Sequence, residues 1–269
     1  MYLKLKKAIT PGTRHQVLID KSLLSSEKPV KTLTSRIVKT GGRNSLGHIT
    51  IRHRGGGKRK LYRQLLDGNI NFRAVVVGIE YDSNRTAFIA RIFDLDRKQF
   101  YYVLASDNLY PGCLIRCGLD VAYRIGFRKP LKEIPTGALI SNVSQFQYGL
   151  GQYARAAGTY CQLIQKLDKY SKIRLPSGEI RLVSSEAYAT IGIVSNKKQK
   201  SIELGKAGRT RYLGRRPIVR GVAMNPVDHP HGGGQGKTSG GRPSVTPWGK
   251  PTKGQPTRRR TSKYRLTIS

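Results

Sequence analysis

The sequence predicts a mainly β protein, with two small β-barrels in tandem between two basic extensions that have no core of their own. The charge is unevenly distributed, because residues 1–63 and 200–269 each hold sixteen Lys and Arg against two acids, whereas residues 64–199 carry a net charge of only +7. In this centre, short apolar runs follow one another at close spacing between turn residues, as in small all-β domains. Residues 221–256 contain nine Gly and six Pro, too little apolar surface to offset the entropy of ordering them.

Eight strands are expected in the centre, in two sets. The first set is separated by the turn-like Asp82–Arg85 and the polar residues 94–98, and the second follows Pro130. Leu175-Pro-Ser-Gly-Glu179 supplies a turn between two strands of the second set. The expected strands are 72–81, 86–93, 99–104, 138–143, 159–164, 171–175, 180–183 and 190–194.

Composition limits the function classes. The 269 residues have a net charge of +35, a pI near 10.6 and 38% apolar residues, so the chain has enough apolar material for a modest core and needs a polyanionic partner. Three cysteines give no disulfide framework and suggest a reducing compartment. No run approaches the ~18 apolar residues of a membrane span, no secretory signal is visible at the N-terminus, and no basic amphipathic helix supports membrane-surface binding.

The first extension carries a glycine-interrupted basic segment, residues 41–63. Seven of its last twelve residues are Arg, Lys or His, around three consecutive glycines. Glycines let a backbone approach a phosphate chain, and Arg and Lys pair with phosphate oxygens. A solvated flexible tail is the alternative, but the β-branched Ile49, Thr50 and Ile51 within the segment favour polyanion binding.

The second extension contains Asp228, His229 and His231 in a loop rich in Gly and Pro. Two histidines beside an acid also suggest a metal site or a general base, but no further ligand lies nearby at a suitable spacing and the loop offers no rigid, dry scaffold. We expect instead a loop threaded against folded RNA, with these side chains bonding 2′-hydroxyls, phosphates or each other. Trp248 and Arg258–Arg260 fit base stacking and phosphate contact.

The cysteines are expected to be small buried hydrophobic residues. Cys113 and Cys117 have loose zinc spacing, but they lie in an alternating Cys-Leu-Ile-Arg-Cys stretch. The chain also lacks a P-loop, an H-E-x-x-H motif and paired carboxylates at a spacing useful for catalysis. A soluble enzyme or a general nucleic-acid-binding protein that uses the Asp228, His229 and His231 loop is therefore the alternative to a structural RNA-binding protein.

The run Asn225-Pro-Val-Asp-His-Pro-His-Gly-Gly-Gly234 resembles the signature of the universal family of large-subunit ribosomal protein two. Arg220-Gly-Val-Ala-Met224 precedes the run and Thr246-Pro-Trp-Gly249 follows it. Further matches in the same order extend the resemblance over essentially the whole chain. They are Thr10–His15, Gly42-Arg-Asn44, Arg52–Gly57, Ala156–Thr159, Leu175–Glu179, Ala189–Gly192 and Gly205–Gly208.

The resemblance implies an OB-type barrel followed by an SH3-like barrel, with basic extensions that penetrate rRNA. The corresponding parts are an N-terminal extension (1–60), an OB-type barrel (61–128), an SH3-like barrel (129–199) and a C-terminal extension (200–269). It implies a structural constituent of the large ribosomal subunit that supports subunit association, tRNA placement and the peptidyl transferase region, near which the histidine loop lies. Peptide transfer is the work of RNA, so no enzyme activity is expected.

The expected partners are large-subunit rRNA and neighbouring ribosomal proteins, with tRNA and the small subunit nearby and no membrane. No cofactor or protein-held metal is expected, and Mg²⁺ bridging to rRNA stays open. The residues expected to bind rRNA are Arg43, Asn44, Arg52, His53, Arg54, Lys58, Arg59, Lys60, Arg63, Arg155, Lys206, Arg220, Asn225, Asp228, His229, His231, Lys237, Trp248, Arg258, Arg259 and Arg260.

The sequence departs from the family pattern in three places. Gln235 stands where the family usually has Glu, residues 145–152 replace a Pro-Gly-Lys-Gly-Gly run, and Ala187-Tyr188 replaces Cys-Arg. Such changes suggest a specialised ribosome. Because no transit peptide is visible, a mitochondrial, organelle-encoded protein is expected, with a plastid or a bacterial cytoplasm as alternatives.

Overall fold

The computed structural model describes residues 3–68, 70–119, 121–236, 238–254, 267 and 268. The fold is mainly β, which confirms the predicted class. The chain divides into two compact units. The barrel unit comprises Met1–Val38, Arg59–Ala207 and Arg265–Ser269, and the loop unit comprises Lys39–Lys58 and Gly208–Tyr264. The chain thus leaves the barrel unit twice and returns to it twice.

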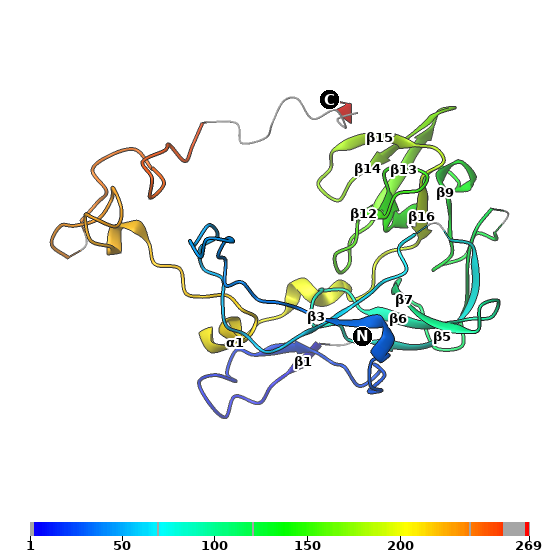
Figure 1. Cartoon of the computed structure of the whole chain (residues 1–269), viewed down its shortest axis with the longest axis horizontal. Coiled ribbons are helices and arrows are strands. Elements are labelled where there is room, and N and C mark those ends of the chain that lie inside the picture. Colours follow the sequence, from blue (N-terminus) through cyan, green and yellow to red (C-terminus); the bar gives the residue numbers. More distant parts are fainter. Residues whose placement is uncertain (1–2, 69, 120, 237, 255–266, 269) are drawn as a thin grey trace. The chain divides into compact units, whose positions relative to one another are not determined.

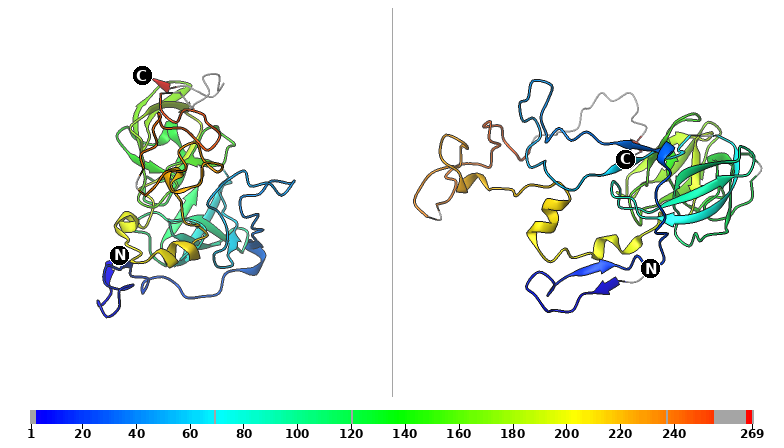
Figure 2. Two further views of the ribbon diagram at one scale, coloured as in Figure 1. Left: turned by 90° about the vertical axis from the view of Figure 1, so that its left-hand side faces the viewer. Right: turned by 60° about the horizontal axis from the view of Figure 1, so that its bottom comes forward.

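Most regular structure belongs to the barrel unit, whereas the chain after α1 is drawn mainly as loop (Figures 1 and 2). No helix in the described ranges is long and apolar enough to cross a membrane. The strands are β1 (Leu3–Leu5), β2 (Val17–Ile19), β3 (Thr34–Arg36), β4 (Leu61–Arg63), β5 (Phe72–Glu80), β6 (Ile89–Asp94), β7 (Gln99–Leu104), β8 (Leu114–Cys117), β9 (Arg128–Pro130), β10 (Leu139–Ser141), β11 (Val143–Ser144), β12 (Gly151–Tyr153), β13 (Cys161–Lys166), β14 (Tyr170–Arg174), β15 (Ile180–Ser184), β16 (Tyr188–Ile191) and β17 (Thr267–Ile268). The short helices are η1 (Lys31–Leu33), η2 (Leu131–Glu133), η3 (Lys197–Ser201), α1 (Ala207–Tyr212) and η4 (Gly221–Ala223).

In the first set of strands, β5, β6 and β7 form an antiparallel meander and β8 returns to pair with β5, so the order is β8-β5-β6-β7 as in a Greek key. In β5 the side chains of Phe72, Ala74 and Val76 are buried and alternate with more exposed ones, as expected for a strand with one face on a core. The expected strand 86–93 starts late, at Ile89, because Thr86 bonds outside the ladder. Its carbonyl accepts from Asn196 Nδ2 and its hydroxyl from the Ala157 amide.

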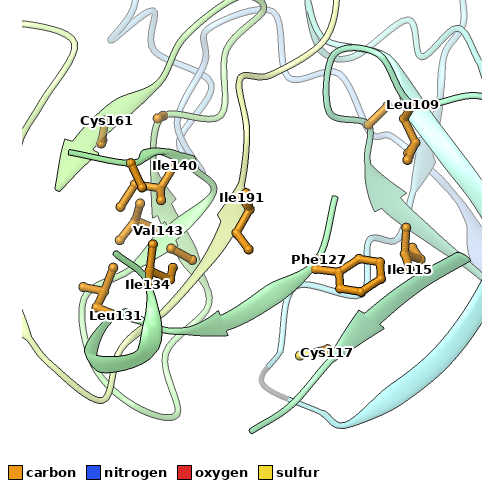
Figure 3. Close-up of a cluster of buried hydrophobic side chains, with 14 of the residues drawn as sticks. Leu109, Ile115, Cys117, Phe127, Leu131, Ile134, Ile140, Val143, Cys161 and Ile191 are labelled. Atoms are coloured by element: carbon orange, nitrogen blue, oxygen red, sulfur yellow. The ribbon is translucent and has the colours of Figure 1, made fainter. Parts of the chain in front are cut away.

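The second set of strands is continuous with the first. A single parallel pair, Cys117↔Arg128, joins β8 to β9, so one 11-stranded sheet runs in the order β17-β15-β14-β13-β10-β16-β9-β8-β5-β6-β7. Its buried side chains form one large cluster. Figure 3 shows Leu131, Ile134, Ile140 and Val143 gathered near Cys161, and Leu109, Ile115 and Phe127 gathered apart from them. The hydrophobic core therefore extends along both sets of strands.

A buried ionic network holds β5 against β6 and β7. Glu80 is 2% exposed. Its carboxylate pairs with Arg91 and with Arg63, where Arg63 Nη2 lies 3.3 Å from Oε2, and accepts a hydrogen bond from Tyr102 Oη at 3.3 Å. Buried charges persist in proteins when they are paired and hydrogen-bonded in this way.

The N-terminal residues 3–38 pack on the barrel unit. Ile19 and Leu24 lie against the main core cluster. The Ser25 amide donates to Ile79 O at 2.8 Å, and the Val30 amide donates to Tyr102 Oη at 3.0 Å. The boundary between the two units therefore falls at Val38, inside the expected N-terminal extension.

Cys117 and Cys161 are buried, as expected for small hydrophobic residues, and Cys113 is half-buried. Burial raises the pKa of the Cys117 thiol to about 11 and that of Cys161 to about 12. Thiolates are the reactive form, so iodoacetamide at pH 8 should modify both slowly in the native protein and rapidly in urea. Mass spectrometry of the cysteine peptides measures the rates, and equal rates in both conditions would contradict burial of these thiols.

Candidate nucleic-acid interface

The loop unit is strongly cationic and has almost no core. Its sequence contains eighteen Lys and Arg against one acid, Asp228. Among its described residues, Gly42, His229 and Val245 are buried. Because like charges repel and little apolar surface is covered, we expect a polyanion to stabilise this unit.

The two histidines of the loop bind backbone amides of their own unit. The His231 amide donates to Nδ1 of His229 at 3.0 Å, and the Val245 amide donates to Nε2 of His231 at 3.2 Å. The two rings meet edge to face, with centroids 5.0 Å apart. A ring nitrogen that accepts a hydrogen bond carries no proton. The histidines thus act as structural acceptors of main-chain hydrogen bonds.

Glycines allow the loop to close around these rings. A Cβ on Gly221 would lie 2.5 Å from Nδ1 and Cε1 of His229, and one on Gly240 would lie 2.8 Å from Nδ1 of His231. The Asn225 carbonyl closes the turn by accepting a hydrogen bond from the Asp228 amide at 3.0 Å. The same carbonyl oxygen would lie 2.2 Å from a Cβ on Gly232, so the turn requires glycine at that position. The Asn225 and Asp228 side chains are exposed.

The structure brings the two predicted basic segments together in one hollow of about 430 Å³. Arg52 and His53 from the first segment line it with His229 and Trp248 from the second. The Arg52 guanidinium carbon lies 5.2 Å from the Trp248 ring centroid, and the Trp248 side chain is 69% exposed. A cation over an exposed aromatic face forms a surface on which a base stacks beside its phosphate.

The glycine-rich segment is folded by its own polar groups. Asn44 Oδ1 accepts from the amides of Leu46 at 3.1 Å and His48 at 2.9 Å. Lys39 Nζ donates to the carbonyls of Gly56 at 3.2 Å and Gly57 at 2.9 Å. These bonds hold the backbone in loops, while Arg43, Arg54 and Lys58 remain exposed.

The segment around Arg54 lies against the segment after α1. The Gly55 amide donates a hydrogen bond to Gly214 O, and the Arg216 amide donates one to His53 O. The main chains of Arg54 and Arg215 pair as an isolated antiparallel β-bridge. Arg54, Arg215 and Arg216 are exposed and are thereby held close together, and none of them forms an ion pair with an acid within the described residues. Such a cluster suits a phosphate chain.

Sequence reasoning missed Arg211, Arg215 and Arg216. The signal was present, since Arg209-Thr-Arg-Tyr-Leu-Gly-Arg-Arg216 places four arginines in eight residues. It also missed Lys39, whose role in folding the glycine loop depends on contacts that no local pattern indicates.

Five predicted contacts belong to the barrel unit. Arg59 and Lys206 are exposed. Lys60 Nζ donates to Ser83 O at 2.8 Å, Arg63 pairs with Glu80, and Arg155 pairs with Asp67 and donates to Gly151 O. The last two guanidinium groups are thus already engaged with carboxylates of the protein.

The remaining predicted residues are Arg220, which is exposed, and Lys237 and Arg258–Arg260, which lie outside the described residues. Within the described ranges, no three His, Cys, Asp or Glu side chains gather closely enough to hold a metal ion.

Two family models match the chain. The one for the RNA binding N-terminal domain of ribosomal proteins L2 covers residues 30–117, and the one for the C-terminal domain of the same proteins covers residues 124–249. The chain belongs to the ribosomal protein L2 family. The L2 N-terminal match includes the basic glycine segment, and the L2 C-terminal match includes the histidine loop and Trp248.

Named L2 relatives agree over the full length. The chain is 50% identical to the large ribosomal subunit protein uL2m of Reclinomonas americana, over all of this chain and 98% of the relative. It is 53% identical to uL2 of Rickettsia felis over 98% of both chains, and 51% identical to uL2 of Rhodospirillum centenum over 96% of this chain and 94% of the relative. The resemblance inferred from the motifs is therefore confirmed.

Proposed function

We propose that this protein is a structural constituent of the large ribosomal subunit that binds rRNA, and that the loop unit is its main RNA-binding part. The observation that carries the proposal is the charge of that unit, eighteen cations against one acid with only three described residues buried. Membership of a ribosomal protein family supports a structural role rather than an enzymatic one. The neighbouring partners are other proteins of the large subunit.

The strongest proposed contacts are the exposed cations and the Arg52–Trp248 pair. Arg43, Arg54, Lys58, Arg215, Arg216 and Arg220 present their side chains to solvent. Arg63 and Arg155 contribute less, because each already pairs with a carboxylate. Lys237 and Arg258–Arg260 extend the same basic segment and remain proposed contacts from the sequence.

The finer role proposed is support of subunit association, tRNA placement and the peptidyl transferase region. Since His229 Nδ1 and His231 Nε2 already accept main-chain hydrogen bonds, the loop supplies shape and packing rather than a general base. The four-part division into an N-terminal extension (1–60), an OB-type barrel (61–128), an SH3-like barrel (129–199) and a C-terminal extension (200–269) belongs to the same proposal.

A mitochondrial ribosome is the proposed location. The support is the similarity to uL2m of Reclinomonas americana at 50% identity, and the uL2 proteins of Rickettsia felis and Rhodospirillum centenum are similar at 53% and 51%. A bacterial cytoplasm and a plastid are the alternatives. Fractionation of the source cells, followed by peptide mass spectrometry of ribosomes from each compartment, separates them.

Binding of the full-length protein to its large-subunit rRNA should weaken steeply with salt. Each neutralised phosphate lowers log K by roughly 0.7–0.9 per log unit of salt, and the loop unit offers many exposed cations. We expect a slope steeper than about −3 in filter-binding titrations. A shallower slope, or absence of the protein from sedimented large subunits, would refute the electrostatic account.

A further inference from the structure

A second hollow lies in the barrel unit, away from the residues expected to bind rRNA. It has a volume of about 470 Å³, within the roughly 300–1,000 Å³ of typical small-ligand sites. Its wall combines Ile19 and Leu23 from the N-terminal segment with Phe88, Leu109 and Tyr110 of the barrel. The N-terminal segment thus completes a cavity on the barrel instead of lying over a flat surface.

The hollow combines apolar walls with buried polar groups. Phe88 and Leu109 are buried, and Ser106, Ser195 and Asn196 are each less than 8% exposed. Ser195 Oγ accepts from the Phe88 amide at 3.1 Å, which leaves its hydroxyl proton for another acceptor. Asn196 Nδ2 donates to Thr86 O and Gln199 Oε1, whereas Asn196 Oδ1 has no hydrogen-bond partner in the described chain. A buried acceptor without a donor points to a polar ligand.

The mouth of the hollow carries two lysines, one acid and an aromatic ring. Lys197 and Lys198, at the start of η3, line it together with Asp107, whose Oδ2 lies 2.7 Å from Lys197 Nζ and balances the charge of that lysine, so the mouth keeps a net charge of one cation. Tyr110 also lines it and is 65% exposed, so one face of its ring is accessible. An apolar peptide anchor would need neither the lysines nor the buried hydroxyls.

We propose that this hollow binds one unstacked RNA base, which stacks on Tyr110 while its phosphate lies near Lys197 and Lys198. Ser106, Ser195 and the exposed Asn108 supply hydrogen bonds to the base edge. Proteins that bind single-stranded RNA use this combination of an aromatic platform, edge donors and nearby cations. The proposal rests on the proposed rRNA-binding function and adds a base-specific site in the barrel unit.

The test compares two probes of equal length, an oligouridine and an abasic oligonucleotide with the same number of phosphates. Binding of the full-length protein to each is measured by fluorescence anisotropy at one salt concentration. Tyr110→Ala should weaken oligouridine binding about tenfold, a typical loss for one stacked base, and leave abasic binding unchanged. Tyr110→Phe should retain the affinity. Tyr123→Ala is the matched control, since Tyr123 is 52% exposed in the same unit and does not line the hollow.

Loss of the base site and loss of rRNA binding give different results. Photocrosslinking of oligouridine should place a nucleotide adduct on the peptide that contains Tyr110. Equal effects of Tyr110→Ala and Tyr123→Ala, or no effect of either, would overturn the base site while salt-sensitive RNA binding remains. If the wild-type protein bound neither probe, the rRNA-binding function itself would be wrong.

Discussion

A Gly221→Ala variant is expected to enter large ribosomal subunits far less often than the wild type. The new Cβ would lie 2.5 Å from Nδ1 and Cε1 of His229, so the ring must move and the His231 amide must lose its acceptor. His231 is half-buried, so the loss lies at the lower end of the about 1–3 kcal/mol that a buried group without its hydrogen bond costs. Quantitative mass spectrometry of sedimented subunits, in cells that express both forms, should show wild-type protein exceeding the variant by roughly tenfold.

Gly208→Ala is the matched control for this substitution. Gly208 lies in α1 of the same unit, and a Cβ there meets nothing within 4 Å. Alanine is also the better helix former, so this variant should enter subunits as the wild type does. Equal incorporation of the Gly221 and Gly208 variants would show that the His229 ring has room to move.

His229→Ala tests whether the same ring has a chemical role. If the ring only packs and accepts the His231 amide, the variant lowers the yield of subunits, and those that assemble still transfer peptides. If the ring is a general base, subunits assemble normally and the pH profile of the chemical step changes. Fully assembled variant subunits with normal tRNA binding and no peptide transfer would contradict the structural role.

Removal of the Glu80 carboxylate is expected to cause the largest loss of folding stability. Glu80→Ala leaves Arg91 and Arg63, whose side chains are 10% and 14% exposed, without their shared buried partner. Breaking a buried ion pair on one side typically costs about 3–5 kcal/mol. Urea unfolding of the full-length protein, followed by circular dichroism, measures the change in the free energy of unfolding.

Asp96→Ala is the matched control, because it removes an exposed ion pair with the same nitrogen–oxygen distance. Asp96 Oδ1 lies 3.3 Å from Arg73 Nη2, the separation also found between Glu80 and Arg63, but these side chains are 55% and 52% exposed. Exposed pairs contribute at most about 1 kcal/mol. If both variants lost the same stability, burial of the Glu80 network would not be its decisive property.

Sequence patterns predicted the parts of the fold that local alternation determines. The runs that became β5 and β7 were identified as short apolar runs between turn residues, and in the structure buried side chains alternate with less buried ones along β5 and in the second half of β7. The link between the two strand sets could not be foreseen, because it consists of one parallel residue pair, Cys117↔Arg128, between short strands. The three-residue strands β1 and β2 carry too few residues for any periodicity.

For the interface, the sequence identified the candidate residues but not the residues that they contact. The basic glycine segment selected Arg52, the histidine loop selected His229 and the stacking role selected Trp248, but the meeting of these residues in one hollow depends on contacts between distant segments. The hydrogen bonds that the histidine rings accept could not be predicted either, since every residue type except proline has a main-chain amide and the sequence does not indicate which amide donates. The carboxylate partners of Arg63 and Arg155 arise from long-range pairing in the same way.

The double departure of the chain from the barrel unit affects how RNA is released. Lys39–Lys58 and Gly208–Tyr264 are both flanked by chain that belongs to the barrel unit, and together they form the loop unit. Once the loop unit binds an RNA, the barrel unit meets that RNA at the high effective concentration of a tethered ligand. Because dissociation requires both units to detach before either rebinds, the protein should leave rRNA more slowly than the loop unit would alone.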